Sequence, residues 1–179
     1  ILRSDGGAVL IAEQYYIYER FRNNFSPYVG GRFYRNDLNQ VDYYYNYNDI
    51  IVVNIRPNGE IEWATRIPKK QVTVNDNGYY SSYSMAAVRD RIYFVFNDNG
   101  RNYESDSDDN RIYNFNGKNS IISLAEVRKD GDLQIYPLFS NRDAGIITRP
   151  KICQQIGRKT MLVYGERGRK YRFGNLNFD

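Results

Sequence analysis

Short runs of apolar, often β-branched residues alternate along this chain with turn-forming and polar segments, a pattern typical of antiparallel strands. The clearest example spans Asn48 to Pro68, where two apolar runs flank the turn Pro57-Asn58-Gly59. This pattern predicts a β-hairpin. The segment from Asn119 to Phe139 has the same pattern, with Gly131 in the position of Gly59. A supersecondary unit used twice indicates a repeat architecture.

Another strand pattern recurs in three places. The apolar run Ala8 to Gln14 corresponds to Ile92 to Asp98 and again to Thr160 to Glu166, and a short turn introduces each copy. Before the last two copies a further strand is predicted, at Tyr79 to Val88 and at Ile147 to Ile156. Two strands joined by a short charged turn form a hairpin. The order within one unit is therefore strand, tight turn, strand, long loop, strand, glycine turn, strand.

Four antiparallel strands in sequence, repeated about every 70 residues, are typical of propeller blades. We therefore predict an all-β, propeller-like fold of repeated four-stranded antiparallel blades. Residues 1–70 would form blade one without most of its first strand, 79–140 blade two, and 146–179 the start of blade three. Because propellers close with roughly four to eight blades, we expect an incomplete fragment of a larger propeller. Trp63 lies at an alternating apolar position and is expected to pack between blades.

The composition agrees with strands and ordered loops and excludes several kinds of chemistry. The chain has 18 Tyr, 9 Phe and 1 Trp but no histidine, and aromatic residues favour strands. The lack of histidine removes the commonest general base and the commonest transition-metal ligand. Cys153 is the single cysteine, which excludes an internal disulfide and a cysteine-rich metal site. We expect Cys153 to be a small buried hydrophobe in a strand.

The charge is mixed, since 25 basic and 21 acidic residues give a net charge of +4. Such an even mixture of positive and negative charges does not favour nucleic acid as a partner. The run from Arg167 to Phe173 interleaves basic and aromatic residues and could contact phosphates, but we favour a solvated edge strand whose charges discourage pairing. The sequence shows no signal peptide and no apolar run of membrane-spanning length. The first residues have the pattern of a strand inside a sheet, so we expect the sequence to be a piece of a longer protein.

Two long loops, from Tyr18 to Asn48 and from Asn97 to Asn119, are rich in Asn, Asp, Gly, Tyr and Arg. Loops of this length are usually functional or disordered, and the tyrosines favour order, with an extra short hairpin. Tyrosine suits recognition surfaces, although alternate strand residues must face the core. The candidate binding residues are Tyr43, Tyr45, Tyr47, Arg101, Tyr103, Arg169 and Tyr171.

One acidic stretch could hold calcium, the one cofactor that the sequence suggests. Asp106, Asp108 and Asn110 place oxygen ligands at alternate positions. The stretch lacks the glycine and the closing glutamate of the helix-loop-helix calcium site. The alternative is a solvated loop tip.

Paired carboxylates for glycoside cleavage are a further alternative, because propellers can host glycosidases. The carboxylates considered are Glu13, Asp98, Glu104 and Glu166. The turn RPNGEIEW resembles the aspartate box of sialidases but lacks both its serine and its aspartate. The sequence therefore favours a binding module over an enzyme.

Two motifs carry a resemblance to a protein family. The string IYFVFNDNGRN (Ile92 to Asn102), with the hairpin VNIRPNGEIEWATRIPKKQ, resembles uncharacterised β-propeller-like envelope proteins of the Bacteroidetes type. These share a strand ending in N-D-x-x-x-N and a hairpin with x-x-G-x-I-x-W. The third copy of the strand departs from the motif at Gly165-Glu166-Arg167. The resemblance implies an exported or envelope-associated protein with a binding or scaffolding role, and it transfers no catalytic residues.

Taken with the loops, these features predict a non-catalytic binding or scaffolding module outside the cytoplasm, in the periplasm, on the outer membrane or secreted. Its partner would be a protein or the remaining blades of the same protein. The alternative is carbohydrate binding or glycoside hydrolysis on the loop face. A sugar site predicts aromatic rings beside carboxylates in a concave pocket, whereas a protein-binding surface predicts a flatter exposed Tyr/Arg patch.

Overall fold

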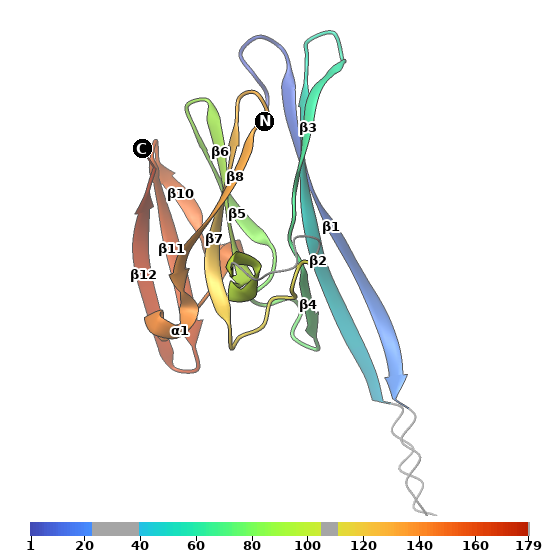
Figure 1. The fold of residues 1–179 in the computed structure, drawn as a ribbon, viewed down its shortest axis with the longest axis vertical. Helices are drawn as coiled ribbons and strands as arrows, with labels where there is room; N and C mark the ends of the chain where they lie inside the picture. The colour runs from blue at the N-terminus through green and yellow to red at the C-terminus, as the bar shows by residue number, and fades with distance from the viewer. Residues whose placement is uncertain (23–39, 105–110, 179) are drawn as a thin grey trace, which may run out of the picture.

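The computed structural model describes residues 1–22, 40–104 and 111–178. Its strands form three antiparallel sheets of four strands each, stacked side by side (Figure 1). In chain order they are called the first, middle and third sheets. The prediction of an all-β chain with four-stranded antiparallel sheets is confirmed. Short helical turns interrupt the strands, namely η1 (Gly100–Tyr103), α1 (Asn141–Ala144) and η2 (Pro150–Ile152).

The first sheet contains the two longest strands. Its members are β1 (Ala8–Arg22), β2 (Gln40–Ile55), β3 (Ile61–Ile67) and β4 (Gln71–Val74). β1 pairs with one side of β2 along its length, and β3 and β4 follow one another along the other side. The predicted long loop from Tyr18 to Asn48 therefore consists largely of these two strands where it is described. The two-stranded part formed by Tyr15–Arg22 and Gln40–Tyr47 is called the arm.

The middle sheet follows the order of its strands in the sequence. These are β5 (Tyr83–Val88), β6 (Arg91–Asn99), β7 (Ser120–Arg128) and β8 (Leu133–Ser140). Both of its faces are covered by the neighbouring sheets (Figure 1). A strand that is buried on both faces needs no polar alternation, which explains the uninterrupted apolar run from Ile92 to Phe96.

The third sheet corrects two predictions. Its strands are β9 (Ile147–Thr148), β10 (Gln154–Gly157), β11 (Thr160–Arg167) and β12 (Lys170–Asn177). A continuous strand was expected from Ile147 to Ile156, but η2 divides it, because Pro150 has no N–H to donate to a neighbouring strand. Cys153, expected in a strand, follows η2 and lies outside β10. The C-terminal residues form β12 after a tight turn at Gly168, whose φ is 62°. β12 is an edge strand of this sheet.

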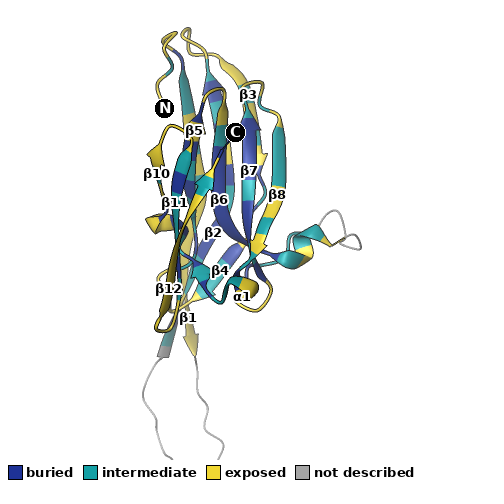
Figure 2. Cartoon of the chain, turned by 90° about the vertical axis from the view of Figure 1, so that its left-hand side faces the viewer, coloured by how far each residue is buried: buried dark blue, intermediate teal, exposed yellow. Residues whose placement is uncertain are grey.

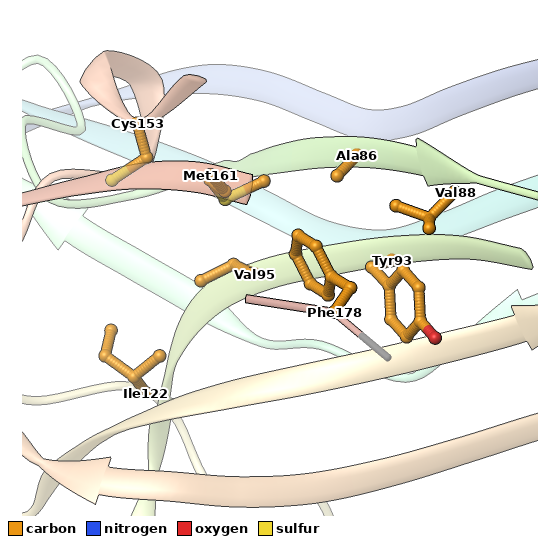
Figure 3. Close-up of a cluster of buried hydrophobic side chains, with 8 residues drawn as sticks. All are labelled: Ala86, Val88, Tyr93, Val95, Ile122, Cys153, Met161 and Phe178. Atoms are coloured by element: carbon orange, nitrogen blue, oxygen red, sulfur yellow. The ribbon is translucent and has the colours of Figure 1, made fainter. Parts of the chain in front are cut away.

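Two apolar layers hold the stack together. Between the first and middle sheets the buried side chains are Ile50, Val52, Ile67, Phe94, Phe96, Ala125 and Val127. Between the middle and third sheets they are Ala86, Val88, Tyr93, Val95, Ile122, Cys153, Met161 and Phe178 (Figure 3). β6 supplies alternate residues to both layers, as the period of a strand requires. This strand is therefore the centre of the fold.

Trp63 lies between the first and middle sheets, where it was expected to pack. It contacts the apolar layer, and its indole Nε1 donates to the carbonyl of Lys129 in the middle sheet at 2.9 Å. The ring faces Gly131, where a Cβ atom would lie 2.8 Å from the indole. Gly131 also has a φ of 87°, which L side chains rarely adopt. The glycine turn therefore shapes the hairpin and makes room for the tryptophan.

Cys153 is buried in the second apolar layer, as predicted for a small hydrophobe (Figure 3). Burial raises the pKa of its thiol. A thiol that is neutral and enclosed is a poor nucleophile. The residue therefore contributes packing.

One predicted correspondence between strands is wrong by a single residue. The sequence aligns Ile92 with Thr160, but the residue that closes the hairpin turn is Arg91 in the middle sheet and Thr160 in the third. An irregularity between Gln155 and Gly157 accounts for the shift. Because a one-residue slip reverses which face a side chain occupies, Met161 points into the core.

The apolar layer between the first and middle sheets yields a stability prediction. Phe94 is fully buried there, so Phe94→Ala should lower the free energy of unfolding by about 3–5 kcal/mol. Leu2 is 90% exposed, and Leu2→Ala should change it by less than about 0.5 kcal/mol. Chemical denaturation of the two variants and the parent checks this. Equal losses in both variants would contradict the assignment of this layer as core.

Candidate functional site

A buried polar network joins the three sheets next to the apolar layers. Its centre is Asn97 on β6, which is fully buried. The Asn97 side-chain Nδ2 donates to the carbonyls of Tyr80 at 2.8 Å and Thr148 at 2.7 Å, and its Oδ1 accepts from Asn141 at 2.7 Å. Its backbone carbonyl accepts from Gln71 Nε2 at 2.7 Å. One residue of the middle sheet is therefore bonded to β4 of the first sheet and β9 of the third.

A buried ammonium group completes this network on the side of the first sheet. Lys69 Nζ lies 2.8 Å from Glu13 Oε1 and donates to the Tyr47 carbonyl at 2.8 Å and to Gln71 Oε1 at 3.1 Å. Ser82 donates to the other Glu13 oxygen at 2.8 Å. Burial lowers the pKa of Lys69, and the Glu13 carboxylate opposes this shift. The ammonium group makes two hydrogen bonds and one ion pair, so the geometry is that of a structural ion pair.

The motif residues Asp98 and Asn102 hold the turn η1 against the middle sheet. Asp98 Oδ1 accepts from the backbone N–H of Asn99 and from Asn102 Nδ2, both at 2.7 Å. Its Oδ2 lies 3.1 Å from the hydroxyl of Tyr103, which is 2.9 Å from Ser123 Oγ. Burial raises the pKa of Asp98, and these donors oppose the shift. The N-D-x-x-x-N motif thus has a structural role in this chain.

A second carboxylate, Glu166 on β11, is held by an aromatic and cationic cluster nearer the surface. Its Oε1 accepts from the Tyr79 hydroxyl at 2.6 Å and from Arg149 Nη1 at 2.9 Å, and its Oε2 accepts from the Tyr164 hydroxyl at 2.8 Å. The Arg149 guanidinium also lies over the Tyr79 ring, 3.7 Å from its centroid. The hydrogen bond from Tyr79, followed by that from Tyr164, lowers the pKa of Glu166. The carboxylate therefore stays ionised and hydrogen-bonded.

The arm projects from the stack (Figures 1 and 2). Aromatic side chains are exposed on both of its faces, since the neighbouring residues Tyr15 and Tyr16 are both exposed. Tyr18 of β1 stacks on Tyr44 of β2, with ring centroids 4.6 Å apart and ring planes 8° from parallel. The exposed aromatic residues of the arm are Tyr15, Tyr16, Tyr18, Phe21 and Tyr43. Arginines lie among them, and Arg22 pairs with the buried carboxylate of Asp42. The arm is therefore a two-stranded ribbon with exposed aromatic rings on both faces and arginines among them.

The predicted binding tyrosines of β2 have three different environments. Tyr43 is exposed on the arm. The Tyr45 hydroxyl donates to Asn77 Oδ1 at 2.5 Å. Tyr47 is buried, and Lys151 Nζ donates to its hydroxyl at 2.8 Å. The prediction of Tyr47 as a binding residue is not supported, because the loop before β5 and Lys151 cover its ring.

The other predicted binding residues lie at the next two connections. Arg101 is exposed on η1, with its guanidinium 5.7 Å from the Tyr113 ring centroid, whereas Tyr103 is engaged with Asp98. Arg169 and Tyr171 are exposed at the turn between β11 and β12. These connections and the arm leave the stack at the same end (Figure 1). The structure therefore places the predicted groups at one end, in separate clusters.

The remaining carboxylate candidates lie in different settings. Glu13 pairs with Lys69, Asp98 is bonded to the residues of η1, and Glu166 belongs to a different cluster. Glu104 caps the end of η1 and is exposed. Asp106, Asp108 and Asn110 lie outside the described residues, so the calcium site stays a prediction. Within the described ranges no three His, Cys, Asp or Glu residues group as metal ligands.

A cleft of about 390 Å³ opens between the first and middle sheets at the opposite end of the stack. Arg3 and Arg128 line it, together with Trp63. Arg3 pairs with Glu62 at 3.1 Å, and Arg128 pairs with Glu126 at 3.0 Å. Because these guanidinium groups are already paired, the cleft is a weaker candidate site than the arm.

No family model matches the chain, and neither a curated protein nor a solved structure is similar to it. Across the described segments, no helix has the length and apolar character needed to cross a membrane. Sequence reasoning missed Lys69 and Arg149. Nothing local marks these residues, because their roles depend on contacts between sheets.

The buried ion pair yields a prediction by double mutation. Lys69→Met leaves the Glu13 carboxylate buried without its cation and should lower the free energy of unfolding by about 3–5 kcal/mol. Glu13→Gln in the same chain removes that charge, so the double variant should regain at least about 1 kcal/mol. Denaturant unfolding of both single variants and the double variant measures the coupling. Purely additive losses would mean that the two charges do not stabilise one another.

The Glu166 cluster yields a pH prediction. Because the folded pKa of Glu166 lies below the value of 4.5 for an unperturbed glutamate, its contribution to stability is present above pH 4.5 and is lost as the pH falls through the folded pKa. Tyr79→Phe removes the largest cause and should raise the pKa of Glu166. Carbon-13 NMR titration of the carboxyl group measures the shift. Tyr136→Phe, which removes a hydroxyl bonded to Gln134, is the control and should leave that pKa unchanged.

Proposed function

We propose that this chain is a non-catalytic, propeller-like binding module that recognises a macromolecular partner, a protein, through the arm and the loops beside it. The single observation that carries the proposal is the set of exposed aromatic side chains on the arm, with Tyr18 on one face and Phe21 and Tyr43 on the other. These rings extend from two paired strands, so the backbone of the arm would lose little conformational entropy on binding. Rigid aromatic rings of this kind are typical anchors of protein interfaces.

The shape and charge of the arm favour a protein over a small molecule. A small-molecule site is usually a concave pocket, whereas the arm is a two-stranded ribbon that projects from the stack (Figure 1). Arg20 adds positive charge beside the rings, whereas Arg22 is paired with Asp42. Arginine with tyrosine is enriched at interface hot spots. A partner with an apolar patch bordered by acidic residues would fit this surface.

A location outside the cytoplasm is part of the proposal and rests on the resemblance of the two sequence motifs to envelope proteins. The stacked four-stranded sheets support a propeller-like arrangement, since neighbouring blades pack face to face in the same way. The settings of Glu13 and Asp98 support a non-catalytic role, because Glu13 is paired with Lys69 and Asp98 accepts a hydrogen bond from Asn102.

A second candidate function, carbohydrate binding, is favoured by the Glu166 cluster. There the rings of Tyr79 and Tyr164 lie beside a carboxylate, and sugars bind by stacking on rings and hydrogen bonding to charged groups. Tyr79 is partly exposed. A glycan array with the parent chain and Glu166→Gln distinguishes the two functions, since binding that is lost in this variant would assign the cluster to sugar.

The arm can be tested by capture from an envelope extract. Immobilised parent chain should retain a protein partner, and the triple variant Tyr18→Ala, Phe21→Ala, Tyr43→Ala should retain at least about tenfold less, because each lost anchor costs on the order of 1–2 kcal/mol. Quantitative mass spectrometry measures the bound fraction. Tyr136→Ala removes a similarly exposed ring from β8 and should bind as the parent does. Equal capture by the triple variant would reject the arm as the binding surface.

A further inference from the structure

The two outermost sheets, the first and the third, expose apolar faces. On the first sheet, the face directed away from the middle sheet contains Leu10, Ile51 and Ile61, which are 56%, 36% and 66% exposed. This surface is called the outer face of the first sheet. An antiparallel sheet with only solvent on one side normally has polar residues there, so the composition of this face indicates a covered surface.

The third sheet has a matching aromatic face. Tyr164 of β11 lies opposite Phe173 of β12, and their ring centroids are 5.1 Å apart. Phe173 and Tyr171 are 64% and 66% exposed. With Leu162 and the carboxylate of Glu166, which lies opposite Tyr171, they form the outer face of the third sheet.

Residues that correspond to the outer face of the first sheet are buried in the middle sheet. The run Ala8–Gln14 corresponds to Ile92–Asp98, and the pairing of each strand with its neighbour preserves this register. Leu10 therefore corresponds to Phe94, which is fully buried against the first sheet. In the middle sheet this position is covered by a neighbouring sheet, whereas in the first sheet it is exposed.

The outer face of the third sheet has the complementary relation to the middle sheet. Counted from the hairpin turns, Tyr171 corresponds to Ile122 and Phe173 to Leu124. Ile122 is fully buried against the third sheet, and Leu124 packs against the same layer. The chain already contains two junctions between neighbouring sheets. The two outer faces correspond to the two sides of such a junction, but they do not meet within one chain.

We propose that the outer face of the third sheet in one copy of this chain docks on the outer face of the first sheet in a second copy. Two copies related by a two-fold axis form this junction twice, and six stacked sheets close into a ring. Six lies within the range of four to eight blades that propellers use. Docking of two identical outer faces is disfavoured, because neither junction inside the chain joins two faces of the same kind. This assembly is independent of partner recognition by the arm.

Analytical ultracentrifugation of the full chain tests the proposal. The parent should sediment as a dimer with twice the monomer mass of 21.1 kDa. Leu10→Glu and Phe173→Glu should each be monomeric, because each variant disables one half of both junctions. An equimolar mixture of the two variants should form dimers, since the intact third-sheet face of Leu10→Glu can meet the intact first-sheet face of Phe173→Glu. Circular dichroism of each variant confirms that it is folded.

The control and the contrary outcomes are equally definite. Tyr136→Glu alters an exposed ring on the middle sheet, and its mass should equal that of the parent. A monomeric parent, a dimer that persists in either single variant, or a mixture that stays monomeric would each overturn the proposal. Open polymers would also overturn it, because a head-to-tail contact that fails to close produces filaments. The arm variants should dimerise normally, which separates this result from the test of the proposed function.

Discussion

The hydrogen bonds of Asn97 are the constraint on which the arrangement of the three sheets depends. Apolar layers attract without direction, so the packing of Phe94 or Val95 alone would tolerate sliding of one sheet over the next. A buried amide that loses its partners costs about 1–3 kcal/mol. Because Asn97 bonds both Gln71 and Thr148, a shift of either outer sheet would leave buried polar groups unpaired. The polar network thereby fixes the register that the apolar layers stabilise.

This network lies toward the end of the stack that also contains the arm, and its position has a consequence for recognition. Lys69 is bonded to the backbone carbonyl of Tyr47, where the arm leaves the core. Lys151, from the third sheet, holds the Tyr47 side chain by a hydrogen bond and by contact with its ring. The base of the arm is therefore fixed from two sheets. Binding groups on a rigid base lose less entropy when a partner docks.

Much of the fold could be predicted from local pattern, and most of the candidate site could not. The turn at Gly59 and the alternation around Trp63 predict their hairpin because both signals lie within a few residues. The burial of Tyr47 depends on Gly78, where a Cβ atom would lie 2.2 Å from the tyrosine ring, and no local signal reports such a contact. The irregularity before Gly157 was missed for the same reason, since bulges have weak sequence signatures. Tyr43, which was predicted as a binding residue because tyrosine in a polar segment has a physical reason to face a partner, is exposed.

The edge strand β12 shows why the outer faces are better explained as an interface than as tolerated exposure. Tyr171 and Phe173 lie on the outer face, and Lys170 and Arg172, which alternate with them, lie on the other face. A sheet that met only solvent would gain from the reverse arrangement, with charge outside and rings toward the middle sheet. Basic residues on β12 discourage pairing along its edge, while its face remains apolar. This strand is therefore protected against edge-to-edge association and left open to face-to-face packing, which is the contact by which the three sheets of this chain already associate.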